Sequence, residues 1–235
     1  MLKNYIFDLG GVLLDIRMKN AYERFVALGL PPTELEPGGF VYKLMEDYQL
    51  GYVTSAEFCE QVASKSAAKA STRCAALPTT SRDIEDAWNS ICLGIADSKL
   101  QALRKLRKTE GVASVSLLSN TNELHWEYCC KNWFNANGNK LDNFFDKIFL
   151  SQEMHLQKPD PEIFKTAIRE LGASPAETIF LDDSPVNTAA AATCGLKTLT
   201  VTPDVDWIKV LAISRVKQQK TFLQKTGRIA RCSPH

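Results

Sequence analysis

Five short apolar runs, separated by stretches with a helical pattern, constrain the fold of this chain of 235 residues more than any other feature. Each run ends in a small or polar residue. Strands that alternate with helices typically build a parallel sheet flanked by those helices. The sequence therefore predicts an α/β, Rossmann-like core with strands at Tyr5–Phe7, Val112–Leu118, Lys147–Leu150, Thr178–Leu181 and Leu196–Val201. The expected helices of this core are Asp97–Lys108, Asn122–Trp133, Pro161–Leu171 and Val186–Cys194.

The segment from Arg17 to Gly94 has a different pattern and contains no convincing strand. Its stretch Ala63–Thr80 is rich in Ala, Ser, Lys and Thr, which is typical of a mobile linker. We therefore expect a discontinuous core, residues 1–16 and 95–235, interrupted by an all-helical insert of residues 17–94. Apolar residues recur at helical spacing in four stretches of that insert, Ala21–Leu28, Phe40–Tyr48, Ser55–Ala63 and Arg82–Ile91.

Composition excludes several classes of function. The formal net charge is +1, so no global field favours nucleic acid or an anionic membrane. The longest uncharged runs have only about a dozen residues, whereas a spanning helix needs about 20. There are seven cysteines and no Cys-x-x-Cys pair, so we expect a reduced, cytoplasmic protein. The chain after Asp206 carries no acidic residue, and a solvated basic helix is the favoured interpretation, with an anion-binding or partner-binding tail as the alternative.

Carboxylates follow two of the predicted strands. Asp8 comes directly after the first strand and leads into the glycine pair Gly10-Gly11, where backbone amides can approach an anion. Asp182 and Asp183 follow another apolar strand. Two adjacent carboxylates repel each other unless a cation or a helix end compensates, and Mg²⁺ does this with oxygen ligands. Helix capping by Asp183 is the structural alternative.

A hydroxyl and a lysine complete the set. Ser119 ends the second long strand and precedes Asn120 at the start of a helix, a geometry that suits either an N-cap or an anion site. Lys158 precedes Pro159 at another helix start. Most single lysines are surface charges, but one fixed beside a phosphate and a carboxylate would neutralise charge.

Along the chain these four motifs come in the order Asp8, Ser119, Lys158 and Asp182-Asp183. Together and in that order they resemble those of the haloacid dehalogenase superfamily. The resemblance extends from Tyr5 to about Val201, and the helical insert resembles that family's cap. The Phe-Asp-Leu-Gly-Gly-Val form of the first motif is similar to a branch that includes bacterial sugar-phosphate phosphatases, as is the stretch Leu150–Met154.

The resemblance implies a role for each motif residue. Asp8 would be the nucleophile that becomes phosphorylated. Mg²⁺ would be bound by Asp8, the carbonyl of Gly10 and Asp183, with Asp182 binding directly or through water. Ser119 and Lys158 would hold the phosphoryl group, assisted by the backbone amides of Leu9, Gly10 and Asn120.

One position departs from the family pattern. The family usually has a second aspartate, a general acid and base, two residues after the nucleophile, and here that residue is Gly10. The threonine that usually follows is Val12. General acid–base help is typically worth about 10²–10⁴-fold. Asp15 and His125 are candidate substitutes, but we expect Asp15 to begin the hinge to the insert and His125 to lie on a helix surface.

The expected function is therefore a magnesium-dependent phosphatase that hydrolyses a small phosphorylated metabolite, with a sugar phosphate as the first candidate. A 2-haloacid dehalogenase is the enzymatic alternative, because it also lacks the second aspartate, although it needs no metal. A catalytically weak binding or regulatory protein on the same fold is the third interpretation. The sequence leaves the oligomeric state open.

Overall fold

The computed structural model of the chain describes residues 1–70 and 79–213. Its centre is a five-stranded sheet in the order β5-β4-β1-β6-β7, in which every neighbouring pair is parallel. Phe7 on β1 pairs with Leu117 on one side and Leu181 on the other. The predicted fold class is confirmed, and the strands are β1 (Asn4–Phe7), β4 (Ser114–Ser119), β5 (Lys147–Leu150), β6 (Thr178–Asp182) and β7 (Lys197–Thr200).

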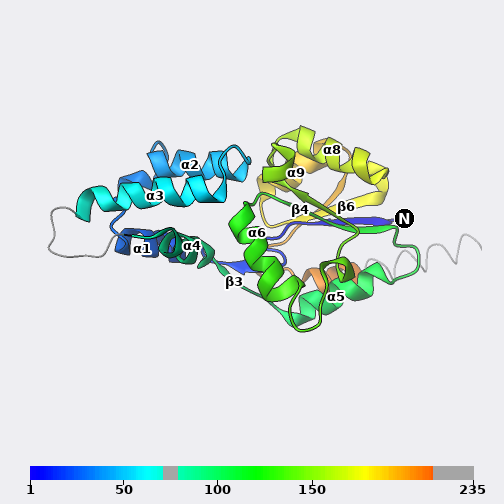
Figure 1. Ribbon diagram of the computed structural model, residues 1–235. Coiled ribbons are helices and arrows are strands. Elements are labelled where there is room, and N and C mark those ends of the chain that lie inside the picture. Colours follow the sequence, from blue (N-terminus) through cyan, green and yellow to red (C-terminus); the bar gives the residue numbers. More distant parts are fainter. Residues whose placement is uncertain (71–78, 214–235) are drawn as a thin grey trace, which may run out of the picture.

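Helices cover both faces of this sheet (Figure 1). Successive side chains of β1 point to opposite faces, so Tyr5 and Phe7 join one apolar cluster and Ile6 joins the other. The cluster around Ile6 includes Phe164 of α8 and Ala191 of α9. The core helices are α5 (Asp97–Arg107), α6 (Glu123–Cys129), α7 (Ser151–Met154), α8 (Pro161–Leu171) and α9 (Pro185–Thr193).

The helix expected at Asn122–Trp133 is shorter than predicted. Asn122 is the N-cap, whose side chain accepts a hydrogen bond from the amide of His125, and α6 ends at Cys129. The chain continues as a π-helical turn, Cys130–Phe134. This wider turn buries Phe134, whose ring packs against Phe144 and Phe145 at centroid distances of 5.5 and 5.4 Å.

Four further helices lie together beside the sheet, on the left of Figure 1. Aromatic packing joins them, because the Trp88 ring lies 5.9 Å from Phe25 and 5.6 Å from Phe58. All three side chains are buried. These helices are α1 (Met18–Ala27), α2 (Phe40–Gln49), α3 (Ser55–Ala70) and α4 (Ser81–Asn89).

Two expectations for this region are wrong. A strand, β3 (Cys92–Ile95), lies at the end of the segment predicted to have none, and it pairs antiparallel with β2 (Leu14–Ile16). Both strands are too short for an alternating pattern to be read from sequence. Helix α3 also continues to Ala70, into the predicted linker, because Ala and Lys are good helix formers. The rest of that linker up to Pro78, and the basic tail beyond Ile213, lie outside the described residues.

Within residues 1–70 and 79–213, no helix combines the length and the apolar character that crossing a bilayer requires. Cys59, Cys92, Cys129, Cys130 and Cys194 carry free thiols. Cys74 and Cys232 fall outside the described part of the chain.

Candidate active site

Three carboxylates meet at the carboxyl edge of the sheet. Asp8 follows β1, and its amide donates to the carbonyl of Leu181 at 2.8 Å. One oxygen each of Asp8, Asp182 and Asp183 lies within 4.8 Å of the others. Gly11, with φ +72°, permits this approach, because a Cβ atom there would collide with the Asp183 carboxylate. The structure thus brings the acidic residues of the first and fourth motifs together, as the parallel topology requires.

Lys158 lies in the middle of these acids and is buried. Its Nζ is 2.8 Å from Asp8 Oδ1 and 2.7 Å from Asp182 Oδ2, and it donates to the carbonyl of Leu118 at 3.1 Å. Burial opposes the charged form, but the attraction of Asp8 and Asp182 outweighs it and raises the Lys158 pKa above its usual value. The ammonium group is therefore permanently charged at neutral pH.

The cluster carries more negative than positive charge. Burial is the largest cause that raises the Asp8 pKa to about 6, and Asp182 raises it further against the opposing attraction of Lys158. Burial, then repulsion from Asp182, also raises the pKa of Asp183. Three carboxylates beside one ammonium form the oxygen-rich, anionic environment that suits Mg²⁺. Asp8, Asp183 and the Gly10 carbonyl remain the candidate ligands.

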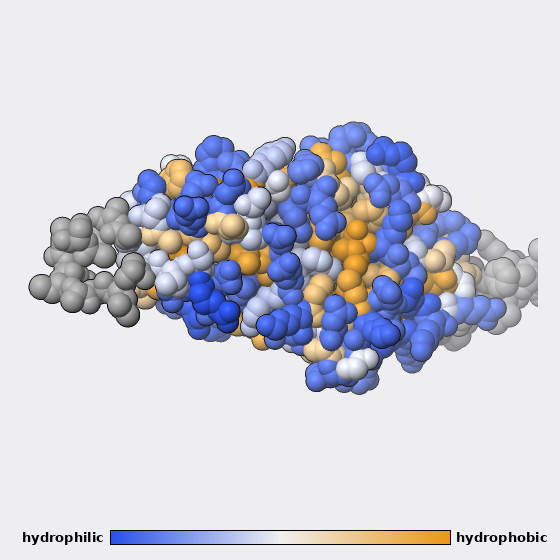
Figure 2. Space-filling view, viewed as in Figure 1, coloured by the Kyte–Doolittle hydropathy of each residue, from blue (hydrophilic) through white to orange (hydrophobic). Residues whose placement is uncertain are grey.

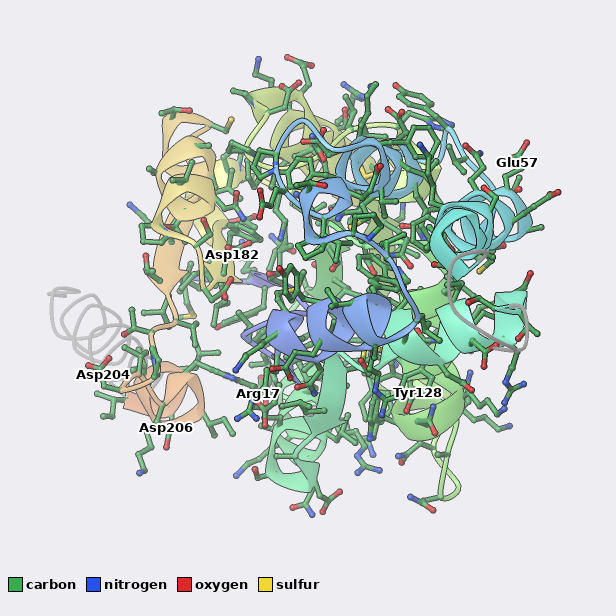
Figure 3. The ribbon with its side chains drawn as sticks, turned by 90° about the vertical axis from the view of Figure 1, so that its left-hand side faces the viewer. Arg17, Glu57, Tyr128, Asp182, Asp204 and Asp206 are labelled. Carbon is green, nitrogen blue, oxygen red and sulfur yellow. The ribbon has the colours of Figure 1, made fainter. Side chains whose placement is uncertain are left out.

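Asp182 is held by its neighbours on both oxygens. Oδ1 accepts from the Ser184 amide at 2.8 Å and from Asn187 Nδ2 at 3.0 Å, while Oδ2 accepts from Lys158. Figure 3 shows Asp182 beside the yellow ribbon of β6 and α9, inside the molecule, whereas Asp204 and Asp206 lie at its periphery. These contacts favour the indirect role for Asp182 over direct metal ligation. Sequence analysis missed Asn187, and no motif marks it.

Asn120 has a role that the sequence did not reveal. Its Nδ2 donates to the carbonyl of Lys158 at 2.8 Å, and the Lys158 amide donates to Asn120 Oδ1 at 2.9 Å. This pair of hydrogen bonds fixes the lysine backbone against the end of β4. The predicted phosphate-binding amide of Leu9 donates to Asp8 Oδ1 at 2.7 Å, so here it orients the carboxylate.

A hollow of about 220 Å³, which we name the inner hollow, opens beside this cluster. Ser119, buried at the end of β4, is part of its wall. A Cβ atom at Gly10 would meet the Ile16 Cδ1 atom at 3.3 Å. Ile16 therefore crowds the position where a side chain at residue 10 would begin. The lining residues are Leu9, Gly10, Leu14, Ile16, Met18, Gln49, Trp88, Ile91, Cys92, Ser119, Asn120, Thr121, Asn122 and His125.

The two substitutes considered for the missing acid have other contacts. The Asp15 side chain, on β2, is 62% exposed and pairs with Lys99 at 2.9 Å. The expectation that His125 lies on a helix surface is wrong, because α4 packs over α6 and buries it. A helical pattern does not indicate which other helix will cover it.

Both ring nitrogens of His125 are occupied. Nε2 lies 3.1 Å from the carbonyl of Trp88, and since a carbonyl only accepts, Nε2 carries the proton. Nδ1 then accepts from Asn122 Nδ2 at 3.0 Å. Burial lowers the His125 pKa to about 4, against the smaller opposing effect of the Trp88 carbonyl. The imidazole is neutral at physiological pH and has no proton directed at the acidic cluster.

Comparisons with known proteins agree with this geometry. The chain is 28% identical over 214 residues to a D-ribitol-5-phosphate phosphatase of Bacteroides thetaiotaomicron, covering 91% of this chain and 98% of the relative. A solved HAD family enzyme from the same organism, in complex with magnesium and inorganic phosphate, is 34% identical with a TM-score of 0.74, covering 88% of this chain and 98% of that one.

An L-2-haloacid dehalogenase from Xanthobacter autotrophicus is more distant, at 20% identity and a TM-score of 0.50, covering 84% of this chain and 76% of that one, so it supports the fold alone. The model of the haloacid dehalogenase-like hydrolases matches residues 2–195. The predicted resemblance is therefore confirmed, and the chain belongs to the haloacid dehalogenase-like hydrolase family.

Proposed function

We propose that this hydrolase is a magnesium-dependent phosphatase that acts on a small phosphate monoester through an aspartyl-phosphate on Asp8. The observation that carries the proposal is the cluster of three carboxylates around one buried lysine. Two anions, a carboxylate and a phosphate, can approach each other only where cations offset their charge. Lys158 supplies one positive charge, and a divalent ion on Asp8, Asp183 and the Gly10 carbonyl would supply the rest.

The contacts of Asp8 suggest which of its atoms reacts. Lys158 and the Leu9 amide both contact Oδ1, which leaves Oδ2 as the oxygen that attacks phosphorus. The alcohol then departs, and water hydrolyses the acyl phosphate to regenerate the carboxylate. Ser119 and Lys158 hold the phosphoryl oxygens during transfer. A bound Mg²⁺ would neutralise negative charge on the carboxylate and the phosphate.

We also propose that residues 17–94 form a cap over this site, inserted between core segments 1–16 and 95–235. Contacts between the end of α2 and the core support this position of the cap. Ser151 Oγ donates to the carbonyl of Gln49 at 2.6 Å, and His155 Nδ1 lies 2.8 Å from the carbonyl of Leu50. At Gly51, a Cβ atom would collide with the carbonyl of Gln152. The cap and the core are therefore in close backbone contact beside the site.

The partner would be a small phosphorylated metabolite, in a cytoplasmic setting consistent with the free thiols. The similarity to a D-ribitol-5-phosphate phosphatase supports a sugar or alditol phosphate as the first class to test. Gly10 is the one feature that favours the dehalogenase alternative.

The test is hydrolysis of p-nitrophenyl phosphate with Mg²⁺ and with EDTA, beside a halide-release assay on 2-chloropropionate. Turnover that requires Mg²⁺ is the expected result. Halide release without metal would replace the proposal by the dehalogenase, and the absence of both activities would favour a binding protein.

A further inference from the structure

A second hollow lies in the helical region, on the other side of two side chains of the inner hollow's wall. It has a volume of about 240 Å³ and lies between α1, α2 and α4. Met18 and Trp88 belong to the walls of both hollows. We name this space the outer hollow, and its lining residues are Met18, Lys19, Ala21, Tyr22, Phe25, Leu35, Met45 and Trp88.

The two spaces together have the size of a ligand site. Pockets that hold small molecules usually measure about 300–1,000 Å³, and each hollow alone is smaller. Leu9, Gly10 and Ser119 connect the inner hollow with the acidic cluster, so a ligand that begins at Asp8 and reaches the outer hollow would pass Met18 and Trp88. An elongated group therefore fits better than a compact one.

The walls offer few free polar atoms, although polar residues are present. His125 uses both ring nitrogens within the wall, and Asn122 Oδ1 accepts from both the His125 amide and Trp88 Nε1. The Asn120 amide is bound to the Lys158 backbone. What these residues present to the hollow is mainly ring face and hydrocarbon. The remaining polar side chains are Gln49, Cys92, Ser119 and Thr121 in the inner hollow and, beside Lys19, Tyr22 in the outer hollow.

Charge is scarce along the same path. None of the residues that line the inner hollow has a charged side chain. In the outer hollow, Lys19 is charged, but its side chain is 76% exposed and pairs with Glu23 at 3.2 Å. Figure 2 shows hydrophilic residues interspersed with hydrophobic ones on the face that it draws. A second phosphate or a carboxylate on the ligand would find no buried cation among these lining residues.

We infer that the group esterified to the phosphate is uncharged, elongated and largely hydrocarbon, and that it extends from Asp8 past Met18 and Trp88 into the outer hollow. This inference rests on the proposed phosphatase function, and it ranks an alkyl phosphate ahead of the sugar or alditol phosphate named above as the first class to test. A polyol chain would leave several hydroxyls without partners in these walls, which weakens binding. A hydrocarbon chain has no polar groups that need hydrogen-bond partners, and the transfer of its apolar surface out of water makes binding more favourable.

The first experiment compares 4-n-alkylphenyl phosphates, from phenyl to 4-octylphenyl. The alkyl chain hardly changes the basicity of the leaving phenol, so chemistry stays constant while apolar length grows. We expect kcat/KM to rise about three- to four-fold per buried methylene until the outer hollow is filled. A flat or falling series, with phenyl phosphate still hydrolysed, would overturn the inference and leave the phosphatase intact.

A second experiment, with one pair of substrates, tests whether hydroxyl groups on the chain weaken binding. n-Pentyl phosphate and D-ribitol 5-phosphate have five-carbon chains that differ only in their hydroxyls. The hydroxyls make ribitol the better leaving group, so a preference for the pentyl ester would come from binding. We expect that preference, whereas faster hydrolysis of ribitol 5-phosphate would contradict the inference.

Matched variants test whether the gain in kcat/KM with alkyl length comes from binding in the outer hollow. Ala21→Leu narrows the outer hollow from α1 and should remove most of the gain for 4-octylphenyl phosphate while leaving phenyl phosphate within about two-fold. Ala56→Leu makes the same change at an exposed position of α3 and should alter neither substrate. If Ala21→Leu is poorly folded, Met45→Phe narrows the same hollow from α2. An unchanged chain-length series in a folded Ala21→Leu or Met45→Phe variant would place the alkyl group elsewhere and overturn the inference.

Discussion

Two polar clusters, buried except for the exposed Asp183, lie near the carboxyl end of β4, and they are built on opposite principles. The cluster of Asp8, Lys158, Asp182 and Asp183 has more acid than base, and the pKa values of Asp8 and Asp183 are raised. The cluster of Trp88, Asn122 and His125 is neutral, and its hydrogen bonds close on one another. The first cluster has an excess of negative charge, which the proposed Mg²⁺ would offset. In the second cluster the polar side-chain atoms already have hydrogen-bond partners within the cluster. We therefore assign it a structural role in the wall of the inner hollow.

This difference in charge and hydrogen bonding indicates a role in chemistry for the first cluster and a role in packing for the second. Buried charges that exceed their counterions cost stability and are retained where a ligand uses them. Buried neutral polar groups with all partners present stabilise one arrangement of the elements that carry them. Substitutions in the first cluster should therefore affect turnover, and substitutions in the second should affect stability.

The largest effect should follow from Asp8→Asn. An amide is not a competent nucleophile, so we expect release of p-nitrophenol to fall by on the order of 10⁴-fold or more, with an unchanged circular dichroism spectrum. Asp15→Asn is the matched control, because that exposed carboxylate contacts Lys99 and not the site. It should retain activity within about three-fold. Full activity in Asp8→Asn would rule out the aspartyl-phosphate route.

His125→Phe tests the contribution of the neutral cluster to stability. It leaves Asn122 and the carbonyl of Trp88 without their buried partner, so we expect a loss of about 2–4 kcal/mol in the free energy of unfolding, measured in urea. Phenyl phosphate turnover at 15 °C, where the variant is folded, should stay within about three-fold. A hundred-fold loss of kcat together with a changed pH profile would assign His125 to the chemistry instead.

Gly10 predicts how the site treats different leaving groups. Without an acid nearby, kcat/KM should fall steeply with leaving-group basicity across substituted phenyl phosphates, and a sugar 1-phosphate should be preferred to its 6-phosphate isomer. The aspartyl-phosphate should accumulate, giving a burst of phenol in rapid mixing. Equal rates across the phenyl series, with the 6-phosphate preferred, would mean that another group supplies the proton.

The contact between Gly10 and Ile16 refines this test. Gly10→Asp alone places its Cβ against Ile16 Cδ1, so the double variant Gly10→Asp/Ile16→Ala is the fairer probe. We expect it to gain about ten-fold or more on the most basic leaving groups and little on p-nitrophenyl phosphate. Ile16→Ala alone is the control for the space that is created.

The smallest effect concerns metal and pH. The Asp8 pKa of about 6 lies above the ordinary value of 3.8, so the native state of the metal-free protein binds the extra proton and loses stability as pH rises between these values. A metal ion competes with that proton. Mg²⁺ at ten times its dissociation constant should stabilise the protein by about 1–2 kcal/mol at pH 8, and clearly less at pH 5. Thermal unfolding at both pH values measures this. An equal shift would mean that the ion binds elsewhere.

The charged cluster could be predicted from sequence because its carboxylates follow recognisable strands, which end at one edge of a parallel sheet, and because Lys158 precedes a proline-marked helix start. The neutral cluster could not. Asn122 and His125 look like an N-cap and a surface residue until α4 covers α6, a contact between segments more than 30 residues apart. Asn187 and the side-chain contacts of Asn120, which was named only for its backbone amide, were missed because an amide side chain carries no signature of what it will bind. Strands β2 and β3 were missed because only their mutual pairing makes them strands.

That pairing has a mechanical consequence. The chain enters the helical region through Leu14–Ile16 and returns through Cys92–Ile95, and the two crossings are hydrogen-bonded to each other. A ribbon of this kind resists twisting and sliding of one crossing past the other, and it bends most easily where its register shifts, between Asp15 and Ile16. The helices would thus swing as one body about a single axis. Since Ile16 also forms part of the wall beside Gly10, any bending at this point would move that wall at the same time.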